Sequence, residues 1–449
     1  MATATSTATA ANGAKGAKGL FAAVARPFRA LLGMQAASGV VLFASAAAAL
    51  VWANVHPQTY RGVFELDLTV GAGLVTGHFT LRELINDLLM SIFFFVVGME
   101  IKRELVTGAL NTTARALLPG IAAIGGMVAP ALIFYAFNQT GPGRPGWGIP
   151  MATDIAFCVG VLTLLGSRVP RTLVVFITAL AIFDDIGGIL VIAIFYGHGI
   201  STAWLLGAAG LLLLLVLVAR AGVVNGLAFL GIGVGLWFAL HHGGIHATLS
   251  GVLVGLAIPV RPKRPAREVL HELAGHTATL DRKPADEELE AEEILAIEEK
   301  LEDLESPVRR FVHMWHPWVA WLVMPVFALA NSGVQVTGFT PAALLSPLAL
   351  GVSLGLLLGK PLGIFGATWL AVKLKLAPMP AGTSAYRLFA ASVVAGIGFT
   401  VALFIAALAF PAEAQLEQAK AGVLVGSALA GVVGAVLIRF APRLSETKL

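Results

Sequence analysis

Two adjacent acidic residues, Asp184 and Asp185, lie at the centre of the apolar stretch 172–196. A helix of this length can cross the hydrocarbon core of a membrane. Each carboxylate at mid-membrane costs roughly 2.5–3.5 kcal/mol on insertion scales. Neither can reach water by snorkelling, because about 18 Å of helix separates the pair from the end of the stretch. The pair is therefore expected to bind an ion or protons; the alternative is a buried ion pair without a role in transport.

A third acid, Asp154, lies with Thr153 in a short apolar segment that also contains Pro150. Threonine and aspartate side chains compete for backbone hydrogen bonds. The segment is therefore predicted to be a broken helix, unwound near Thr153 and Asp154, rather than a kinked helix with a hydrogen-bonded aspartate. Irregular backbone at membrane depth occurs only where it lines a cavity or is buried in protein.

A lysine inside an apolar stretch, Lys360, needs an acidic partner unless it snorkels to the membrane surface. A second break is predicted nearby in the chain, where glycines weaken a helix; the residues at this break are Gly396, Gly398, Phe399 and Thr400. Two interrupted helices in corresponding triplets of spans indicate an inverted repeat whose site lies where the breaks cross. Asp154 would offset the positive helix ends there, and Lys360 the negative ones.

The composition excludes an ordinary soluble protein, because 57 % of the 449 residues are hydrophobic and only 12 % are charged. The single cysteine, Cys158, excludes an internal disulfide. The sequence predicts an all-α polytopic membrane protein, with eight spans in 34–260 and four in 311–441. The predicted spans are 37–55, 84–101, 117–137, 149–166, 172–196, 203–219, 223–240, 245–260, 317–336, 346–370, 385–411 and 419–440.

The distribution of basic residues predicts cytoplasmic N- and C-termini, because cytoplasmic loops are enriched in lysine and arginine. With this orientation only four basic residues lie outside, namely Arg61, Arg82, Arg144 and Lys420. Residues 1–33 are expected to be a disordered basic tail, and 442–449 a cytoplasmic tail. The first apolar run is longer than a typical signal-peptide core, so it is interpreted as a retained span rather than a cleaved signal.

Two segments outside the spans have patterns of their own. Residues 57–80 contain alternating apolar and polar residues followed by Gly71 and Gly73, which predicts an extracytoplasmic hairpin. An isolated hairpin is marginally stable, so strand addition between two copies is a hypothesis. Residues 261–310 hold more than half of the 26 acidic residues and are predicted to be a cytoplasmic connection with an amphipathic helix. This helix either packs as a solvated element or binds a regulatory partner.

These residues suit a small hard cation, which prefers oxygen ligands. A carboxylate must lose its proton before it binds a cation, so the two compete, and competition with alternating access gives exchange. The sequence has no GxxxxGK[ST] motif, so a gradient rather than ATP hydrolysis is expected to drive transport. The alternatives are a sodium-coupled symporter of organic acids, a channel, and an intramembrane aspartyl protease. No cofactor and no nucleic-acid partner are expected.

The stretches ATDIAF, ALAIFDDIGGILVIAIFY, GGIHATLSGVLVGLAIP, HPWVAW, GKPLGI and GIGFTVALFIAALAF resemble the bacterial NhaA sodium/proton antiporters over residues 35–440. This resemblance implies electrogenic exchange of cytoplasmic Na⁺ or Li⁺ for a larger number of protons across the bacterial inner membrane. It implies that Asp184 and Asp185 form the ion and proton site, with Asp185 the more direct ligand. Thr153 and Asp154 match the family's unwound crossing, and Lys360 matches the lysine that pairs with the first aspartate.

The resemblance also implies activation at alkaline pH and dimerisation through the hairpin. The residues that match or lie near positions linked to the pH response are Glu100, Arg103, Glu104, His246 and Arg309. One departure concerns the acidic residue that the family often carries four positions before the histidine of HPW. This position is Val312 here, which removes one expected contact of the pH response.

Overall fold

The computed structural model describes residues 35–72, 75–108, 110–197, 199–223, 225–262, 264–280, 293, 296–297, 300–301, 304–335 and 341–441. The predicted tails 1–33 and 442–449 lie outside the described residues, as does most of 281–303. The elements up to the eleventh helix are α2 (Gln35–Val55), α3 (Pro57–Phe64), β1 (Asp67–Ala72), β2 (Val75–Thr80), α4 (Leu81–Leu84), α5 (Met90–Val106), α6 (Thr113–Phe137), α7 (Ile155–Leu164), α8 (Arg171–Phe195), α9 (Thr202–Arg220), α10 (Gly226–Gly243) and α11 (Leu249–Ala257).

The later elements are α12 (Ala266–Leu280), α14 (Pro307–Trp318), α15 (Met324–Asn331), α16 (Pro341–Leu344), α17 (Pro347–Leu354), α18 (Lys360–Lys373), α19 (Ala385–Val394), α20 (Phe399–Ala409) and α21 (Glu413–Phe440). Short 3₁₀ helices occupy Arg144–Met151 and Gly166–Arg168. Single π-helical turns join several of these helices end to end, at Ile85–Leu89, Val319–Val323 and Gly355–Gly359.

Among the described residues, ten helices are long and apolar enough to cross a membrane, and the bent pair α19 and α20 gives an eleventh span. The protein is therefore an all-α, multi-pass membrane protein, as its composition predicts. The predicted span 245–260 contains α11, whose nine residues are too few to cross a membrane alone. Large apolar side chains point outward from the bundle; Ile194 and Leu206 are both 70 % exposed, as suits a surface against lipid.

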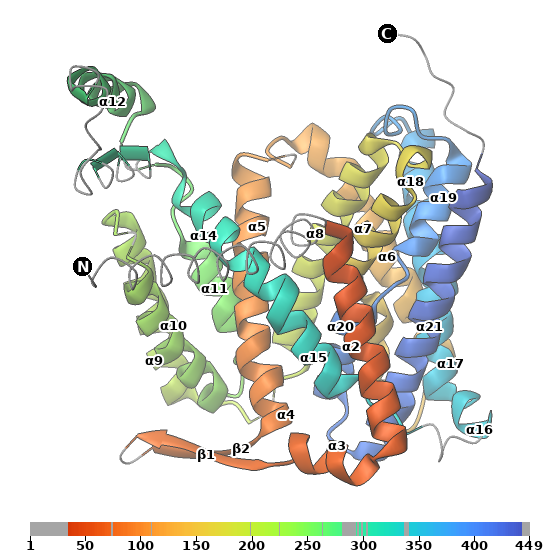
Figure 1. Ribbon diagram of the computed structural model, residues 1–449. Coiled ribbons are helices and arrows are strands. Elements are labelled where there is room, and N and C mark those ends of the chain that lie inside the picture. The colour runs from red at the N-terminus through yellow and green to blue at the C-terminus, as the bar shows by residue number, and fades with distance from the viewer. Residues whose placement is uncertain are drawn as a thin grey trace, which may run out of the picture.

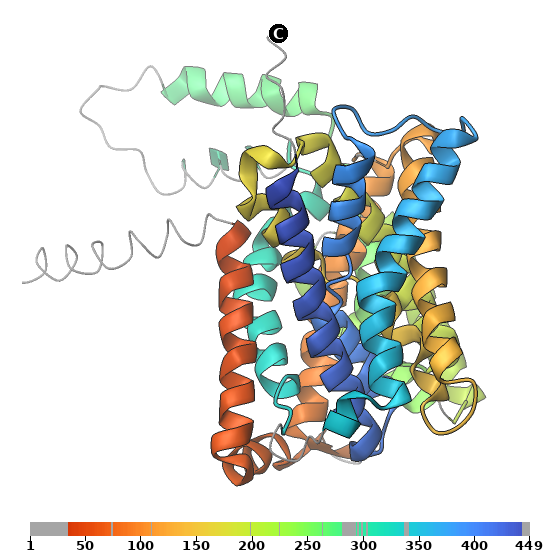
Figure 2. The ribbon, with the colours of Figure 1, turned by 90° about the vertical axis from the view of Figure 1, so that its right-hand side faces the viewer.

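The bundle has two distinct ends (Figure 1). The end that carries α12, where α2 begins and α21 finishes, is named the α12 end, and the end that carries β1 and β2 is named the hairpin end. After a quarter turn, α2 is seen to run alongside α15, which it contacts together with the π-helical turn Val319–Val323 (Figure 2). The first described helix therefore packs against a helix that lies far from it in the chain.

The predicted hairpin at 57–80 is shorter than expected, because α3 occupies its first residues. Pro57 suits the first turn of a helix, and Tyr60 and Phe64 lie four residues apart on one buried face. Strands β1 and β2 pair antiparallel, with Asp67 opposite Thr80. The prediction is therefore corrected to a helix followed by a hairpin at 67–80.

Tyr60 ties α3 to the C-terminal end of α15 at the hairpin end. Its hydroxyl lies 2.8 Å from the carbonyl oxygen of Leu329 and 2.9 Å from that of Ala330. Burial raises the pKa of Tyr60 to about 12. The hydroxyl consequently keeps its proton, and can donate it to these carbonyls, well into the alkaline range.

Close helix contacts through glycine hold the frame around the predicted site. A methyl group added at Gly98 of α5 would lie 2.6 Å from the carbonyl oxygen of Val252 in α11, and Gly251 and Gly255 of α11 lie equally close to the α5 backbone. Gly125 of α6 and Gly363 of α18 approach each other in the same way. These contacts are typical of membrane helices, where small residues let backbones pack tightly.

The described part of the connection 261–310 is mostly helical, with α12 at 266–280 and the start of α14 at 307. In α12, Glu272 pairs with Arg264, and this hydrogen-bonded pairing lowers the pKa of the Glu272 carboxyl. Part of the predicted amphipathic helix lies outside the described residues. At the end of the connection α14 begins, and its residues Val308 and Phe311 are buried.

Candidate ion and proton site

The segment around Asp154 is a broken helix. A 3₁₀ helix ends at Met151, residues 152–154 are extended, and α7 begins at Ile155. Asp154 is the N-cap residue of α7, and its Oδ1 accepts a hydrogen bond of 3.1 Å from the backbone N–H of Phe157. The aspartate thus serves a free backbone donor that the start of the helix would otherwise leave unpaired.

The second break lies between α19, which ends at Val394, and α20, which begins at Phe399; the two helices are bent by 48°. Both predicted glycines sit where other backbone comes close. A methyl group at Gly398 would lie 2.9 Å from the carbonyl oxygen of Ala152, and one at Gly396 would collide with that of Leu356. Glycine is required at 398 because the two breaks touch there, and at 396 because the π-helical turn Gly355–Gly359 comes close.

The two breaks are joined through Asp154. Its backbone N–H donates to the carbonyl oxygen of Ile397 at 2.7 Å. Its Oδ2 accepts from the backbone N–H of Thr400 at 3.2 Å and also from the Thr400 hydroxyl. One buried carboxylate therefore accepts hydrogen bonds from the N-terminal turns of both α7 and α20. Helix N-termini carry partial positive charge, so a carboxylate between two of them is electrostatically favoured.

Asp184 of α8 faces this crossing. Oγ1 of Thr153 lies 2.8 Å from Asp184 Oδ2 and 2.9 Å from the carbonyl oxygen of Ala395, so its one proton is shared between two acceptors. Lys360 forms an ion pair with the same Oδ2, and its side chain is fully buried. The π-helical turn Gly355–Gly359 immediately precedes Lys360. Lysine, threonine and both breaks therefore converge on one oxygen of Asp184.

The remaining carboxylate oxygens of the acid pair have no hydrogen-bond partner among the described residues. Asp184 Oδ1 is buried without a hydrogen-bond partner. Among the residues that the structure describes, the Asp185 carboxylate also has no hydrogen bond or ion pair, and Asp185 is only 6 % exposed. Buried polar atoms without partners are rare and costly, so their presence calls for a ligand or a proton. Three oxygens, one from Asp184 and two from Asp185, are available to a hard cation.

Negative charge is concentrated around Asp185. Asp184, Glu100 and Asp154 all act on its carboxylate, and Lys360 supplies the opposing positive charge. Like charges in a buried site cannot all remain ionised without compensation. A bound proton or a bound small cation can therefore each compensate the negative charge at Asp185. No group of three His, Cys, Asp or Glu residues that could hold a resident metal occurs within the described ranges.

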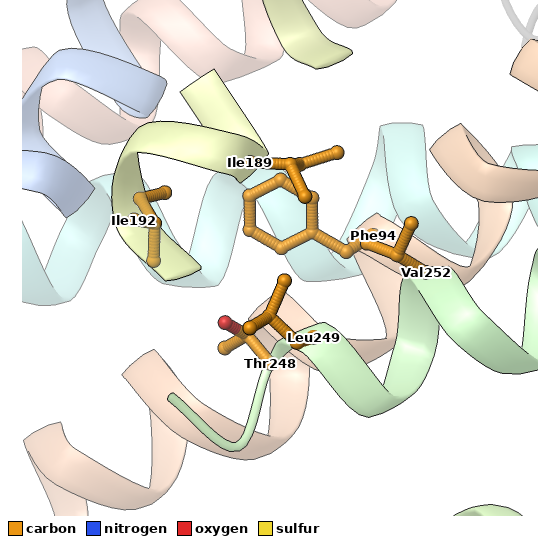
Figure 3. A pocket seen from close by; sticks show the side chains of 6 residues that line it. All are labelled: Phe94, Ile189, Ile192, Thr248, Leu249 and Val252. Atoms are coloured by element: carbon orange, nitrogen blue, oxygen red, sulfur yellow. The ribbon is translucent and has the colours of Figure 1, made fainter. Parts of the chain in front are cut away.

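A narrow, mostly apolar pocket borders α8 on the hairpin-end side of the acids, and Figure 3 shows the side chains that line it. Ile189 and Ile192, one and two turns after Asp185, line it together with Phe94, Thr248, Leu249 and Val252. The pocket has no room for a water molecule. On this side, apolar side chains from α5, α8 and the α10–α11 region separate the carboxylates from the hairpin end.

The five predicted pH-response residues do not share one location. Arg103 and Glu104 form an ion pair of 3.0 Å at the α12 end of α5, one turn after Glu100. Arg309 of α14 is exposed and lies 3.9 Å from Glu305. His246 precedes α11, and its ring packs 5.9 Å from that of Phe404 in α20.

Two residues, one near Glu100 and one at the second helix break, were not predicted from the sequence. His316 of α14 lies within electrostatic range of Glu100, and only the HPW motif around it hints at a special role. Ser427 of α21 accepts a hydrogen bond of 3.1 Å from the backbone N–H of Phe399. A serine in an apolar span has no distinctive sequence signal, because serine is common at helix contacts in membranes.

Comparison with known proteins supports the same assignment as the geometry. Residues 29–438 match the sequence model of a family described as Na⁺/H⁺ antiporter 1. The Na(+)/H(+) antiporter NhaA of Anaeromyxobacter sp. (strain Fw109-5) is 57 % identical over 95 % of this chain and 94 % of its own length. The Na(+)/H(+) antiporter NhaA 1 of Myxococcus xanthus (strain DK1622) is 54 % identical over 94 % of each chain. The chain therefore belongs to the Na⁺/H⁺ antiporter 1 family.

Proposed function

We propose that this protein is a secondary Na⁺/H⁺ antiporter and that Asp184 and Asp185 carry the cation and the protons. The observation that carries the proposal is the uncommitted oxygens of these two buried acids beside the crossing of two broken helices. The family membership and the relatives' printed names agree with it. Li⁺ is proposed as a second substrate because it is also a small hard cation that prefers oxygen ligands.

The exchange follows from competition for the same oxygens. When the carboxylates are protonated they have little affinity for a cation; when they release protons, Na⁺ replaces them at Asp185 and at Oδ1 of Asp184. Thr153, beside Asp184, adds a further oxygen ligand. Lys360 supplies positive charge to Asp184 when this carboxylate is ionised and no cation is bound. Two carboxylates can carry two protons but share one Na⁺, so each cycle moves net charge and is electrogenic.

Regulation by alkaline pH is proposed for the charged groups at the α12 end of α5. Glu100, Arg103 and Glu104 lie together there, and His316 is within electrostatic range of Glu100. Because His316 acts electrostatically on Glu100, a change in the charge of its ring would alter the field at that carboxylate. Arg309 and His246 lie apart from this group and are retained as secondary candidates.

The setting proposed for this activity is the bacterial inner membrane, with the α12 end and both chain termini in the cytoplasm. Charge supports the orientation, because the loops at the α12 end carry most of the basic residues. The two broken helices are proposed to derive from an inverted repeat. A homodimer is proposed to form through the hairpin β1–β2.

Symport of an organic acid with sodium is less well supported. The pocket beside the acid pair has no room for water, and five of its six lining side chains are apolar, so an organic acid would find neither space nor a charged partner there. An intramembrane protease would need facing aspartates on two helices, whereas Asp184 and Asp185 are neighbours in α8.

The replacement Asp185→Asn tests the proposal. It removes the charge that Na⁺ must replace, so Na⁺-dependent and Li⁺-dependent dequenching of a ΔpH dye in everted vesicles is expected to disappear. The matched control is Glu413→Gln, which removes a carboxylate from an exposed ion pair with Arg61 and is expected to leave the signal intact. Exchange that survives in folded Asp185→Asn protein would contradict the assignment.

A further inference from the structure

The first turn of α20 has backbone donors that the helix itself cannot satisfy. Side chains from two other elements serve two of them: Asp154 accepts from the N–H of Thr400, and Ser427 of α21 accepts from that of Phe399 at 3.1 Å. Ser427 is 5 % exposed, so water does not readily substitute for it. The end of α20 is therefore held from both sides, by the candidate site on one side and by α21 on the other.

The helix that supplies Ser427 is firmly seated. A methyl group at Gly426, the neighbour of Ser427, would lie 2.9 Å from the Cα atom of Ser353, and one at Gly422 would lie 2.8 Å from the carbonyl oxygen of Ala349 in α17. Farther along α21, Gly434 packs equally closely on Val394, the last residue of α19. Since α21 is braced against both α17 and α19, Ser427 presents its oxygen from a fixed position.

The hydrogen bond of Ser427 differs from those of two buried hydroxyl groups that bond only locally, Ser392 and Thr368. Ser392 donates to the carbonyl oxygen of Leu388 and Thr368 to that of Ile364, in each case within its own helix. Such local bonds satisfy the hydroxyl without joining two elements. Ser427, by contrast, accepts from a different helix, at the point where that helix begins.

A chain of contacts connects this bond to the acid pair. Phe399 is followed by Thr400, whose hydroxyl and N–H reach Asp154. Asp154 in turn donates its own N–H to Ile397, and its neighbour Thr153 is shared between Ala395 and Asp184. A shift of the α20 terminus would therefore move the acceptors that orient Thr153 and Asp154.

We propose that Ser427 is a positioning residue for cation exchange: it fixes the start of α20 so that Thr153 and Asp154 stay aligned with Asp184. The proposal rests on the function proposed above. Ser427 itself touches neither Asp184 nor Lys360, so its effect is transmitted through the half-helix. The expected consequence of losing its oxygen is poorer cation binding, with the exchange step itself retained.

The test compares Ser427→Ala with Ser392→Ala in everted vesicles, measuring the apparent KM and the maximal rate for Na⁺ and Li⁺. Ser427→Ala is expected to raise the KM for Na⁺ about fivefold or more, with the maximal rate within about twofold of the native value. Ser427→Thr keeps the oxygen and is expected to restore the native KM. Ser392→Ala removes a buried hydroxyl of purely local bonding and is expected to change neither quantity.

A double-mutant cycle tests whether the effect of Ser427 reaches the site through the start of α20 and Asp154. Thr400→Val removes the hydroxyl that joins α20 to Asp154, so its effect on the KM is expected to be non-additive with Ser427→Ala and additive with Ser392→Ala. An unchanged KM in Ser427→Ala, an equal change in Ser392→Ala, or additivity with Thr400→Val would overturn the proposal. If the native protein shows no Na⁺-dependent exchange, the proposed function fails; if only Ser427→Ala is normal while Asp185→Asn is inactive, only the role of Ser427 fails.

Discussion

Asp184 and Asp185 are neighbours in sequence but have different surroundings. Adjacent residues on a helix point about 100° apart, which places Asp184 against Thr153 and Lys360 and leaves Asp185 without a protein partner in the described residues. Asp184 is therefore held by the protein, whereas Asp185 is free to meet a ligand. Both side chains are carboxylates, but Asp184 is positioned by protein contacts and Asp185 is the one available to a ligand.

The ion pair of Lys360 with Asp184 leads to a prediction about stability. Breaking a buried pair by removing one partner typically costs 3–5 kcal/mol, because the other charge stays buried and unpaired. Lys360→Ala is therefore expected to lower the free energy of unfolding by about 3 kcal/mol. Thermal unfolding of the purified protein in detergent measures this change.

The double variant Lys360→Ala/Asp184→Asn supplies the control for this prediction. It removes both charges and is expected to recover a large part of the lost stability, while exchange activity stays impaired because Asp184 is missing. Equal instability of the single and the double variant would show that packing of the lysine, rather than its charge, stabilises the helices.

The chemically distinctive residues of the site could be predicted from the sequence, because charge inside an apolar span is conspicuous. Asp154 and Lys360 meet this criterion, and Thr153 is predicted because its hydroxyl competes for backbone hydrogen bonds. The structure brings all three into the site: Thr153 and Lys360 bond directly to Asp184, and Asp154 is the next residue after Thr153. The uncommitted Oδ1 of Asp184 could not be predicted, since it depends on which oxygen the lysine reaches. Ser427 was missed because its type is ordinary and only its position in space is special.

At the scale of elements, both helix breaks were predictable from local composition. Thr153 and Asp154 compete for the backbone hydrogen bonds of the first helix, and Gly396 and Gly398 have weak helix propensity in the second. Each break therefore follows from the types of the residues that form it. The π-helical turns were not predictable, because the apolar pattern of a span is nearly the same for either hydrogen-bond register. The turn Gly355–Gly359 nevertheless sets the rotation of the helix that starts at Lys360.

The contact of α6 with α18 predicts a sharp difference between two glycines of one helix. Gly363 lies against the backbone of Gly125, whereas Gly366 has open space around it. Gly363→Ala is expected to push α18 away from α6, displace Lys360 and lower both stability and Na⁺ affinity. Gly366→Ala, the matched control, is expected to be neutral or slightly stabilising, since alanine favours helix more than glycine.

The comparison requires thermal unfolding and Na⁺-dependent dequenching for both variants. Equal behaviour of Gly363→Ala and Gly366→Ala in both assays would contradict a role for the close α6–α18 contact. A loss confined to Gly363→Ala would show that the position of Lys360 depends on this contact.

At the scale of the whole molecule, hydrophobicity determines the membrane fold and the distribution of basic charge predicts its orientation. The helix α3 was not predicted, because Tyr60 and Phe64 acquire a common buried face only when α2 and α15 pack beside them. Similarly, α11 looks like a full span by composition but includes only nine helical residues. Both differences arise from packing between segments far apart in the chain.

The proposed dimer can be tested by shortening the hairpin. Asp67 and Thr80 pair across the ladder, so a short Gly-Ser link can replace residues 68–79 without moving α3 or α4. The shortened protein is expected to be a monomer by light scattering in detergent while still exchanging Na⁺ for protons. An unchanged molecular mass would exclude the hairpin as the dimer contact.

The close contact of α11 with α5 has a consequence for how the chain enters the membrane. Nine residues of helix extend only about 13 Å, less than half of the hydrocarbon thickness, so α11 has little tendency to partition into lipid by itself. It finds its place against Gly98 and its neighbours, which are synthesised about 150 residues earlier. The α5 surface around Gly98 must therefore stay accessible during membrane insertion until α11 has been synthesised. A substitution that blocks this surface is expected to leave α11 uninserted.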